Sequence, residues 1–74
     1  MVFEIGKYYE HVGTGELLHI LGKINSTQYG NGLVGESTRN YDLLPIGTEE
    51  SNTVGYVEIT KQCWDEYWNK EEIK

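Results

Sequence analysis

The sequence contains no alanine, one proline and one cysteine among its 74 residues. Because alanine is the strongest helix former, its absence disfavours a helical bundle. The chain instead has many β-branched and aromatic residues, and nine glycines punctuate it every few positions. This composition is typical of short strands joined by turns, so we predict a mainly β protein.

The single cysteine, Cys63, excludes the internal disulfide framework that stabilises many small secreted domains. The first residues, M-V-F-E-I-G-K, have neither the cationic nor the apolar region of a signal peptide. No apolar run in the chain approaches the length of a membrane span. We therefore expect a soluble protein of a reducing cytoplasm that does not act at a membrane.

Basic residues are scarce, since Asp and Glu outnumber Lys and Arg by 12 to 6 and the net charge is −6. This charge repels phosphate backbones, which excludes non-specific binding to nucleic acid, and it favours a partner with a basic surface. A chain this short buries only about 60% of the surface that its unfolded form exposes. Its core is therefore small, with little room for a buried catalytic cleft.

Alternation of apolar and polar residues predicts about five short strands within residues 2–59. We expect a first strand from Phe3, broken at Gly6, with Tyr9 and His11 on one face. The other expected strands are Leu17 to Ile24, Gly32 to Ser37, Leu43 to Ile46 and Tyr56 to Ile59. Pro45 cannot donate to a strand ladder, so its strand should lie at a sheet edge. We predict a single domain, residues 1–74, folded as a small antiparallel barrel or sandwich of SH3-like or OB-like type.

A helix is expected from Lys61 to about Lys70, with Thr60 as its N-cap and a short charged tail at residues 71–74. Cys63, Trp64, Tyr67 and Trp68 form one apolar stripe on this helix. Such a stripe could bind a partner, but a domain this small needs its large side chains for the core. We therefore predict that Trp64 and Trp68 are both substantially buried against the sheet and that Cys63 is a small buried hydrophobe.

The stretch Y-G-N-G-L-V-G-E-S has glycines at the spacing G-x-G-x-x-G of dinucleotide-binding proteins. That fingerprint requires a preceding strand and a following helix. A polar loop precedes Gly30, and the residues after Gly35 have the composition of a turn. We interpret Gly30 and Gly32 as turn positions with positive φ, and Gly35 as a bulge or a close backbone approach.

Residues for catalysis or metal binding are few. The two histidines, His11 and His19, have no Cys or acidic residue at the spacing of a zinc site. Cys63 lies on an apolar helix stripe and is not expected to act as a nucleophile. We expect no enzyme activity, no catalytic residue, no cofactor and no bound metal.

Four segments, G-K-Y-Y-E-H, G-E-L-L-H-I-L-G, L-V-G-E-S with L-L-P-I-G, and G-Y-V-E-I-T-K-Q-C-W-D-E-Y-W, together resemble the small proteins that phages and prophages encode. The resemblance covers nearly the full chain and is one of overall pattern. It implies a phage-like origin and a location in the cytoplasm of the infected host cell. Many short phage proteins block or sequester a host component, and the resemblance implies such a role here.

Two functional classes follow from these observations. The first is an inhibitor whose acidic, tyrosine-rich surface binds a basic host or defence protein, with exposed tyrosines supplying contact area. Its expected contact residues are Glu10, Glu16, Glu36, Asp42, Glu49 and Glu50. The second is an oligomeric sponge that traps a nucleotide-like signalling molecule, with aromatic rings for the base and cations for the phosphate. Its candidate residues are Lys7, Tyr9, His11, Tyr29, Arg39 and Tyr41. A structural role in the virion is a third possibility.

Overall fold

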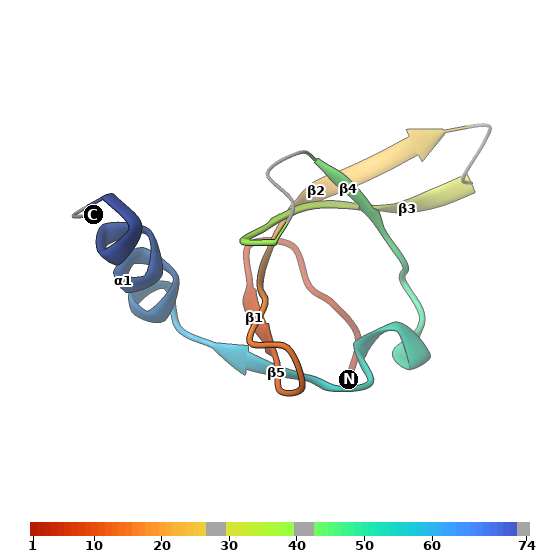
Figure 1. The fold of residues 1–74 in the computed structure, drawn as a ribbon. Coiled ribbons are helices and arrows are strands. Elements are labelled where there is room, and N and C mark those ends of the chain that lie inside the picture. The colour runs from red at the N-terminus through yellow and green to blue at the C-terminus, as the bar shows by residue number, and fades with distance from the viewer. Residues whose placement is uncertain (27–29, 40–42, 73–74) are drawn as a thin grey trace.

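The computed structural model describes residues 1–26, 30–39 and 43–72, which form five strands, a 3-10 helix and an α-helix. In chain order these are β1 (Tyr8–His11), β2 (Leu17–Ser26), β3 (Gly30–Ser37), β4 (Leu44–Ile46), η1 (Glu50–Thr53), β5 (Tyr56–Ile59) and α1 (Lys61–Glu72) (Figure 1). The strands form one antiparallel sheet in the order β4-β3-β2-β1-β5. The prediction of a mainly β protein with about five strands and a C-terminal helix is confirmed.

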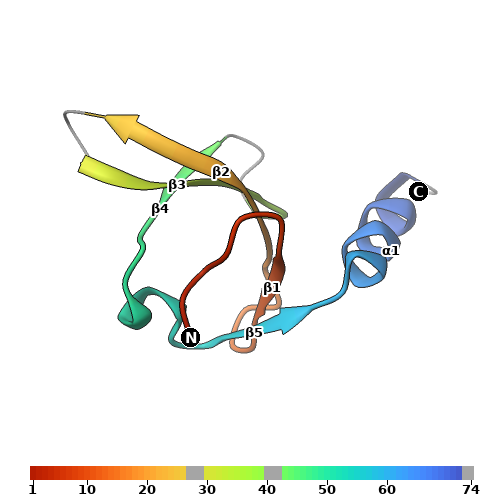
Figure 2. The same ribbon diagram turned by 180° about the vertical axis from the view of Figure 1, so that it is seen from behind.

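The sheet has two edges, β4 and β5, and no strand ladder joins them within the described residues. Pro45 lies in the edge strand β4, as expected from its missing N–H group. In Figures 1 and 2 the sheet curves, so that η1 and the N-terminus lie between its two edge strands. The N-terminus of the chain therefore lies close to η1, the element that precedes β5.

The first strand begins at Tyr8, so the expectation that it starts at Phe3 is wrong. Gly6 adopts a φ of +85°, which turns the chain before β1, and its N–H donates to the carbonyl of Ile20 at 2.8 Å. Residues 1–5 instead run toward η1, where the Thr53 hydroxyl donates to the carbonyl of Met1 at 2.9 Å. Phe3 is 6% exposed, and this path makes it part of the core.

Strand β2 is longer than expected and contains a bulge. Ile20 pairs with Gly35 and Gly22 pairs with Val34, which leaves Leu21 as the extra residue. The strand continues past Ile24, the expected end, into residues 25 and 26, which pair with β3. β2 and β3 form a hairpin, and the end that contains these additional pairs projects from the domain (Figure 1).

The glycines of the G-x-G-x-x-G spacing all lie in β3, which continues to Ser37 without a helix. A Cβ atom on Gly35 would lie 2.9 Å from the carbonyl oxygen of His19, so the predicted close backbone approach is confirmed. Gly32 has no positive φ and pairs with Ile24, and Gly30 pairs with Ser26. The prediction that Gly30 and Gly32 form a turn is therefore wrong, because both belong to the ladder.

The hydrophobic core lies on the inner face of the curved sheet and consists of Phe3, Tyr9, Leu18, Ile20 and Leu33. The ring of Phe3 packs edge-on against Tyr9, with centroids 4.9 Å apart. The Tyr9 hydroxyl accepts the N–H of Glu4 at 2.9 Å, which satisfies the polar end of this buried side chain. The core thus ties the N-terminal segment to β1 and β2.

Two inward-facing phenols have altered acidity. Burial raises the pKa of Tyr9 above 10.0, the ordinary value. Burial and the neighbouring Glu16 carboxylate raise the pKa of Tyr56 above the same value. In the unfolded chain both phenols ionise near pH 10, whereas in the folded protein they stay neutral to higher pH. Neutral tyrosines therefore contribute stability that is present below pH 10 and is lost as the pH rises through the folded pKa.

We expect the urea midpoint of unfolding to be constant between pH 8 and 9.5 and to fall at pH 11. Tryptophan fluorescence measures the midpoint at each pH. Because Tyr56→Phe removes one of the two groups, this variant should show a smaller fall over the same interval. An equal midpoint at pH 9 and pH 11 would contradict the burial of both phenols.

Helix α1 begins at Lys61, as predicted, and the Thr60 hydroxyl accepts the N–H of Cys63 at 3.3 Å as its cap. The helix extends to Glu72, so residues 71 and 72 belong to it and not to a tail. Trp64 is 8% exposed, which confirms its predicted burial. Trp68 is half-buried and thus less buried than Trp64. Cys63 is exposed, so the prediction that it is a small buried hydrophobe is wrong.

The stripe is incompletely buried because α1 stands at one end of the domain, beyond β5, and does not lie flat on the sheet (Figures 1 and 2). The exposed surface is 5137 Å², whereas a compact monomer of this mass exposes about 4,650 Å². The radius of gyration is 12.5 Å, against roughly 11 Å for a compact chain of this length. The projecting helix and the projecting end of the β2–β3 hairpin both contribute to this open shape (Figure 1).

Candidate functional site

The outer face of the sheet carries the contacts that hold α1. Because side chains alternate along a strand, Tyr8 and Glu10 point away from the face that holds Tyr9. The register places Tyr8 opposite His19, and His19 opposite Glu36. Tyr8, His19 and Glu36 therefore form a row across β1, β2 and β3, against which the first turns of α1 can pack.

Trp64 anchors the helix to this row. The rings of Tyr8 and His19 stack with centroids 4.2 Å apart and an interplanar angle of 13°. The Trp64 ring lies 5.8 Å from Tyr8 and 5.5 Å from His19. Nδ1 of His19 lies 3.3 Å from Oε1 of Glu36, which orients the imidazole ring. Trp68 packs against Trp64 with ring centroids 5.6 Å apart and therefore extends the aromatic cluster along α1.

A groove separates α1 from the turn between β1 and β2, and we call it the α1 groove. It consists of a larger hollow of about 490 Å³ and a smaller one of about 230 Å³. Both hollows are lined by Gly15 and Tyr67, so they adjoin at these residues. Gly15 has a φ of +76°, which lets the turn reverse tightly beside the helix. The groove is therefore built by the turn, the sheet and α1 together.

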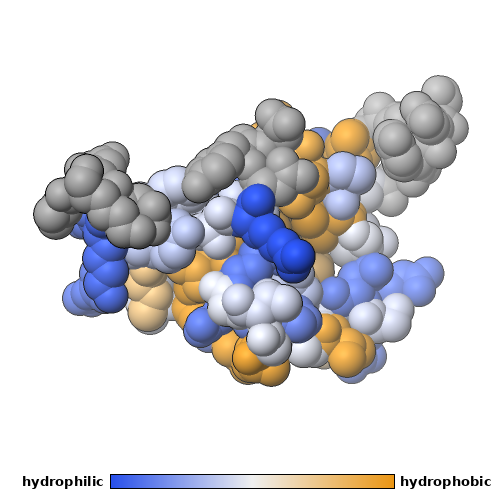
Figure 3. Space-filling view, in the orientation of Figure 1, coloured by the Kyte–Doolittle hydropathy of each residue, from blue (hydrophilic) through white to orange (hydrophobic). Residues whose placement is uncertain are grey.

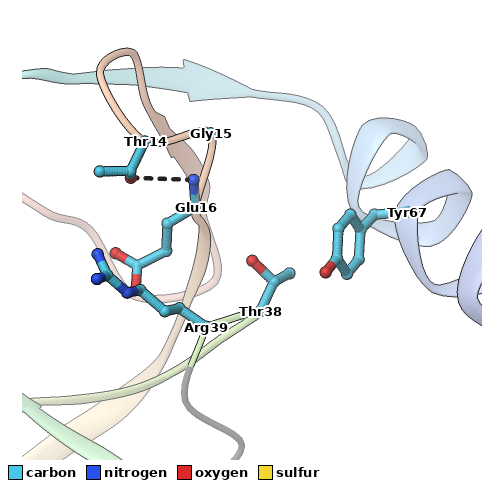
Figure 4. Close-up of a pocket in the computed structure, with 6 residues that line it drawn as sticks. All are labelled: Thr14, Gly15, Glu16, Thr38, Arg39 and Tyr67. Carbon is cyan, nitrogen blue, oxygen red and sulfur yellow. Dashed lines mark hydrogen bonds between the residues drawn. The ribbon is translucent and has the colours of Figure 1, made fainter.

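The larger hollow is polar. Figure 4 shows its lining side chains, with Arg39 and Thr38 at the end of β3 and Tyr67 facing them from α1. The Thr14 hydroxyl accepts the N–H of Glu16 at 3.3 Å. The hollow therefore offers a guanidinium, hydroxyl groups and one aromatic ring, which are groups that can bind an anionic or polar ligand.

Glu16 lies in the larger hollow but is already hydrogen-bonded. Its carboxylate accepts the Ser37 hydroxyl at 3.2 Å and the Tyr56 hydroxyl at 3.1 Å. Thr38 is buried, and its hydroxyl accepts the N–H of Leu17 at 3.0 Å. These bonds connect three strands, so both side chains support the wall of the groove.

The smaller hollow has an apolar floor and charged walls. Leu17 and Ile59 come from the sheet, Glu10 from β1, and Glu66 and Lys70 from α1. Leu17 is 7% exposed, so little of its side chain is open to solvent. Figure 3 shows hydrophobic surface between the helix and the rest of the domain, where the groove lies.

The predicted partner-binding acids are not gathered on one surface. Glu10 lines the smaller hollow, and Glu36 lies beside His19 on the outer face. Glu49 and Glu50 lie at η1, where Glu50 is 3.1 Å from the amino group of Met1. Asp42 lies outside the described residues. The acids therefore form separate groups at the two ends of the domain.

The candidate ligand residues are also dispersed. Tyr9 is 1% exposed in the core, which leaves no ring face for a ligand. Nδ1 of His11 lies 3.2 Å from the N–H groups of both Gly13 and Thr14, so this ring holds the turn after β1. Lys7 pairs with Glu58 at 3.6 Å. Tyr29 and Tyr41 lie outside the described residues, and of the four described members of this set Arg39 alone lines the groove.

Within residues 1–26, 30–39 and 43–72, no group of three or more His, Cys, Asp or Glu side chains is placed to hold a metal ion. In the same part of the chain, no helix has the length and apolar character needed to cross a membrane.

Several groove residues were not singled out from the sequence. Glu66 and Lys70 share a helix face with Cys63 and Tyr67 at positions i, i+3, i+4 and i+7, and all four line the smaller hollow. The spacing was visible in the sequence, but it equally fits a solvent-exposed face. No sequence pattern indicated a role for Thr14, because it lies in an ordinary turn and lines the groove only through the tertiary position of α1.

Comparison with models of protein families, with curated proteins and with solved structures finds no match for this chain.

Proposed function

We propose that this protein is a non-enzymatic binding protein of phage type that inhibits or sequesters a basic host or defence protein. The observation that carries the proposal is the α1 groove, where half-buried Tyr67 lies beside the carboxylates of Glu10 and Glu66. Aromatic residues are enriched in protein interfaces because they supply large contact areas at low entropic cost. The surrounding acids favour a partner of opposite charge.

The charge balance supports the same partner. Two of the basic side chains are engaged in ion pairs, Lys7 with Glu58 and Lys61 with Asp65. Each pair joins one cation to one carboxylate, so the excess of acidic residues and the net charge of −6 are unchanged. The resulting negative potential accelerates encounter with a basic surface and weakens as salt screens it.

The first experiment is a pull-down from host lysate, followed by binding kinetics with the captured partner at increasing salt. We expect the association rate to fall severalfold between 50 and 300 mM salt, while the dissociation rate changes less. Charge reversal at Glu49 and Glu50 tests whether the η1 acids contribute to this steering. If they do, the double variant slows association more than it speeds release. Affinity that is independent of salt would exclude an acidic binding surface.

A sponge for a nucleotide-like molecule is a second candidate, favoured by the volume and lining of the larger hollow. About 490 Å³ is within the range of small-molecule pockets. Arg39 could bind a phosphate and Tyr67 could stack on a base. This function calls for a discrete oligomer that retains its ligand and releases it unchanged on denaturation. Solution mass and nucleotide titration on the pull-down sample distinguish the two functions.

We further propose that the sheet belongs to the small-barrel class of SH3-like or OB-like type. Three features support this: the pairing of the last strand, β5, with the first, β1, the bulge at Leu21 in β2, and the placement of η1 between the edge strands.

A further inference from the structure

The smaller hollow of the α1 groove combines an apolar floor with two carboxylates on opposite walls. Leu17 and Ile59 form the floor, Glu10 projects from β1, and Glu66 projects from α1 with the ring of Tyr67 beside it. Its volume of about 230 Å³ is below the range of typical small-molecule pockets. The hollow therefore suits one long side chain better than a whole metabolite.

Neither carboxylate is neutralised within the described residues. Glu10 has no hydrogen-bond or ion-pair partner there, and Glu66 accepts a hydrogen bond from the uncharged amide of Gln62 at 3.2 Å. Lys70 also lines the hollow but lies in no salt bridge of the described part of the chain. The lining therefore carries two carboxylates and one ammonium group that forms a salt bridge with neither of them, and this excess of negative charge favours a cationic ligand.

We propose that the smaller hollow binds an arginine side chain of a basic protein partner. The apolar stem of the arginine lies over Leu17 and Ile59, as long cationic side chains do on apolar surface. The guanidinium lies between the two carboxylates and against the face of Tyr67. The larger hollow begins at Tyr67 and Gly15, which gives the partner backbone a path beyond the side chain.

Arginine fits the hollow better than lysine does. Its guanidinium is planar, more weakly hydrated than an ammonium, and able to stack on an aromatic ring while it bonds carboxylates in its plane. A second copy of this chain is a poor occupant, because it carries the same net charge of −6. The inference rests on the proposed function, since it locates the contact through which a basic partner would be held.

The experiment compares two probes on the full chain: acetyl-Gly-Arg-Gly-amide and the same tripeptide with uncharged citrulline, which is nearly identical in shape. Amide chemical shifts report the binding site by NMR, and alkylation by iodoacetamide reports access to Cys63, which lines the same hollow. We expect saturable shifts at Leu17, Ile59 and Tyr67 with the arginine probe. The Cys63 alkylation rate should then fall severalfold, whereas the citrulline probe should leave both readouts unchanged.

Matched charge variants then test the two carboxylates. The double variant Glu10→Gln and Glu66→Gln should bind the arginine probe about tenfold more weakly. The control, Glu49→Gln and Glu50→Gln, removes the same charge at the far η1 group and should change the affinity less than about twofold at physiological salt. Lys70→Gln removes the competing cation and should strengthen binding. Far-UV circular dichroism checks that each variant keeps its fold.

Three results would overturn the inference: equal binding of both probes, equal weakening by the two double variants, or no change at Cys63 with saturating arginine probe. Each leaves the proposed function to be judged separately by the salt dependence of binding to the captured partner. If that binding is salt-dependent while the arginine probe does not bind in the smaller hollow, the partner is basic but binds elsewhere on the surface.

Discussion

Replacing Trp64 by alanine is expected to lower the free energy of unfolding by about 3–5 kcal/mol and to release α1 from the sheet. Trp64 is 8% exposed and is the one buried residue in residues 61–70 of the helix. Its ring packs against both Tyr8 and His19, which stack on each other. Loss of this anchor leaves an isolated helix of 12 residues, which is marginal in water.

Urea denaturation measures the loss of stability, and far-UV circular dichroism before denaturation measures the loss of helix. The matched control is Trp68→Ala, which removes the same side chain one turn later. Trp68 is half-buried, so its replacement should cost about 1–2 kcal/mol and leave the helix docked. Equal losses for both variants would show that α1 packs along its whole length.

Replacing Ile20 by alanine is expected to cost about 2–5 kcal/mol. Ile20 is 0% exposed at the centre of the core. Its N–H donates to the carbonyl of Lys7 at 3.1 Å and its carbonyl accepts the N–H of Gly6, so it also joins the N-terminal segment to β2. A domain of this length is stable by only roughly 4–11 kcal/mol, so the variant will be close to unfolding at 37 °C.

Thermal denaturation followed by circular dichroism measures this effect, because about 1 kcal/mol shifts the melting temperature by 4–8 °C in a domain of this size. The control is the adjacent residue. Leu21 is the bulge residue, is 41% exposed, and should cost less than about 1 kcal/mol when replaced by alanine. If Leu21→Ala is the more damaging change, the strand is shifted by one residue, because such a shift exchanges the two faces.

The sequence by itself determined the local structure of this protein. The strand from Tyr56 to Ile59, the edge position of Pro45 and the start of the helix after Thr60 were all predicted and confirmed. Each depends on backbone preferences or on contacts within a few residues. Such interactions are the same wherever the segment lies in the fold, which is why they can be read without it.

The tertiary structure decided which of two similar residues is buried and which residues meet. Trp64 and Trp68 have the same chemistry, but Trp64 packs on the Tyr8–His19 stack and is buried, whereas Trp68 lies one turn further along α1, which leaves the sheet at an angle, and is half-buried. The α1 groove depends on the same angle, since it exists only when the turn at Gly15 lies beside Tyr67. The docking angle of a helix arises from long-range packing, and no local pattern in the sequence encodes it.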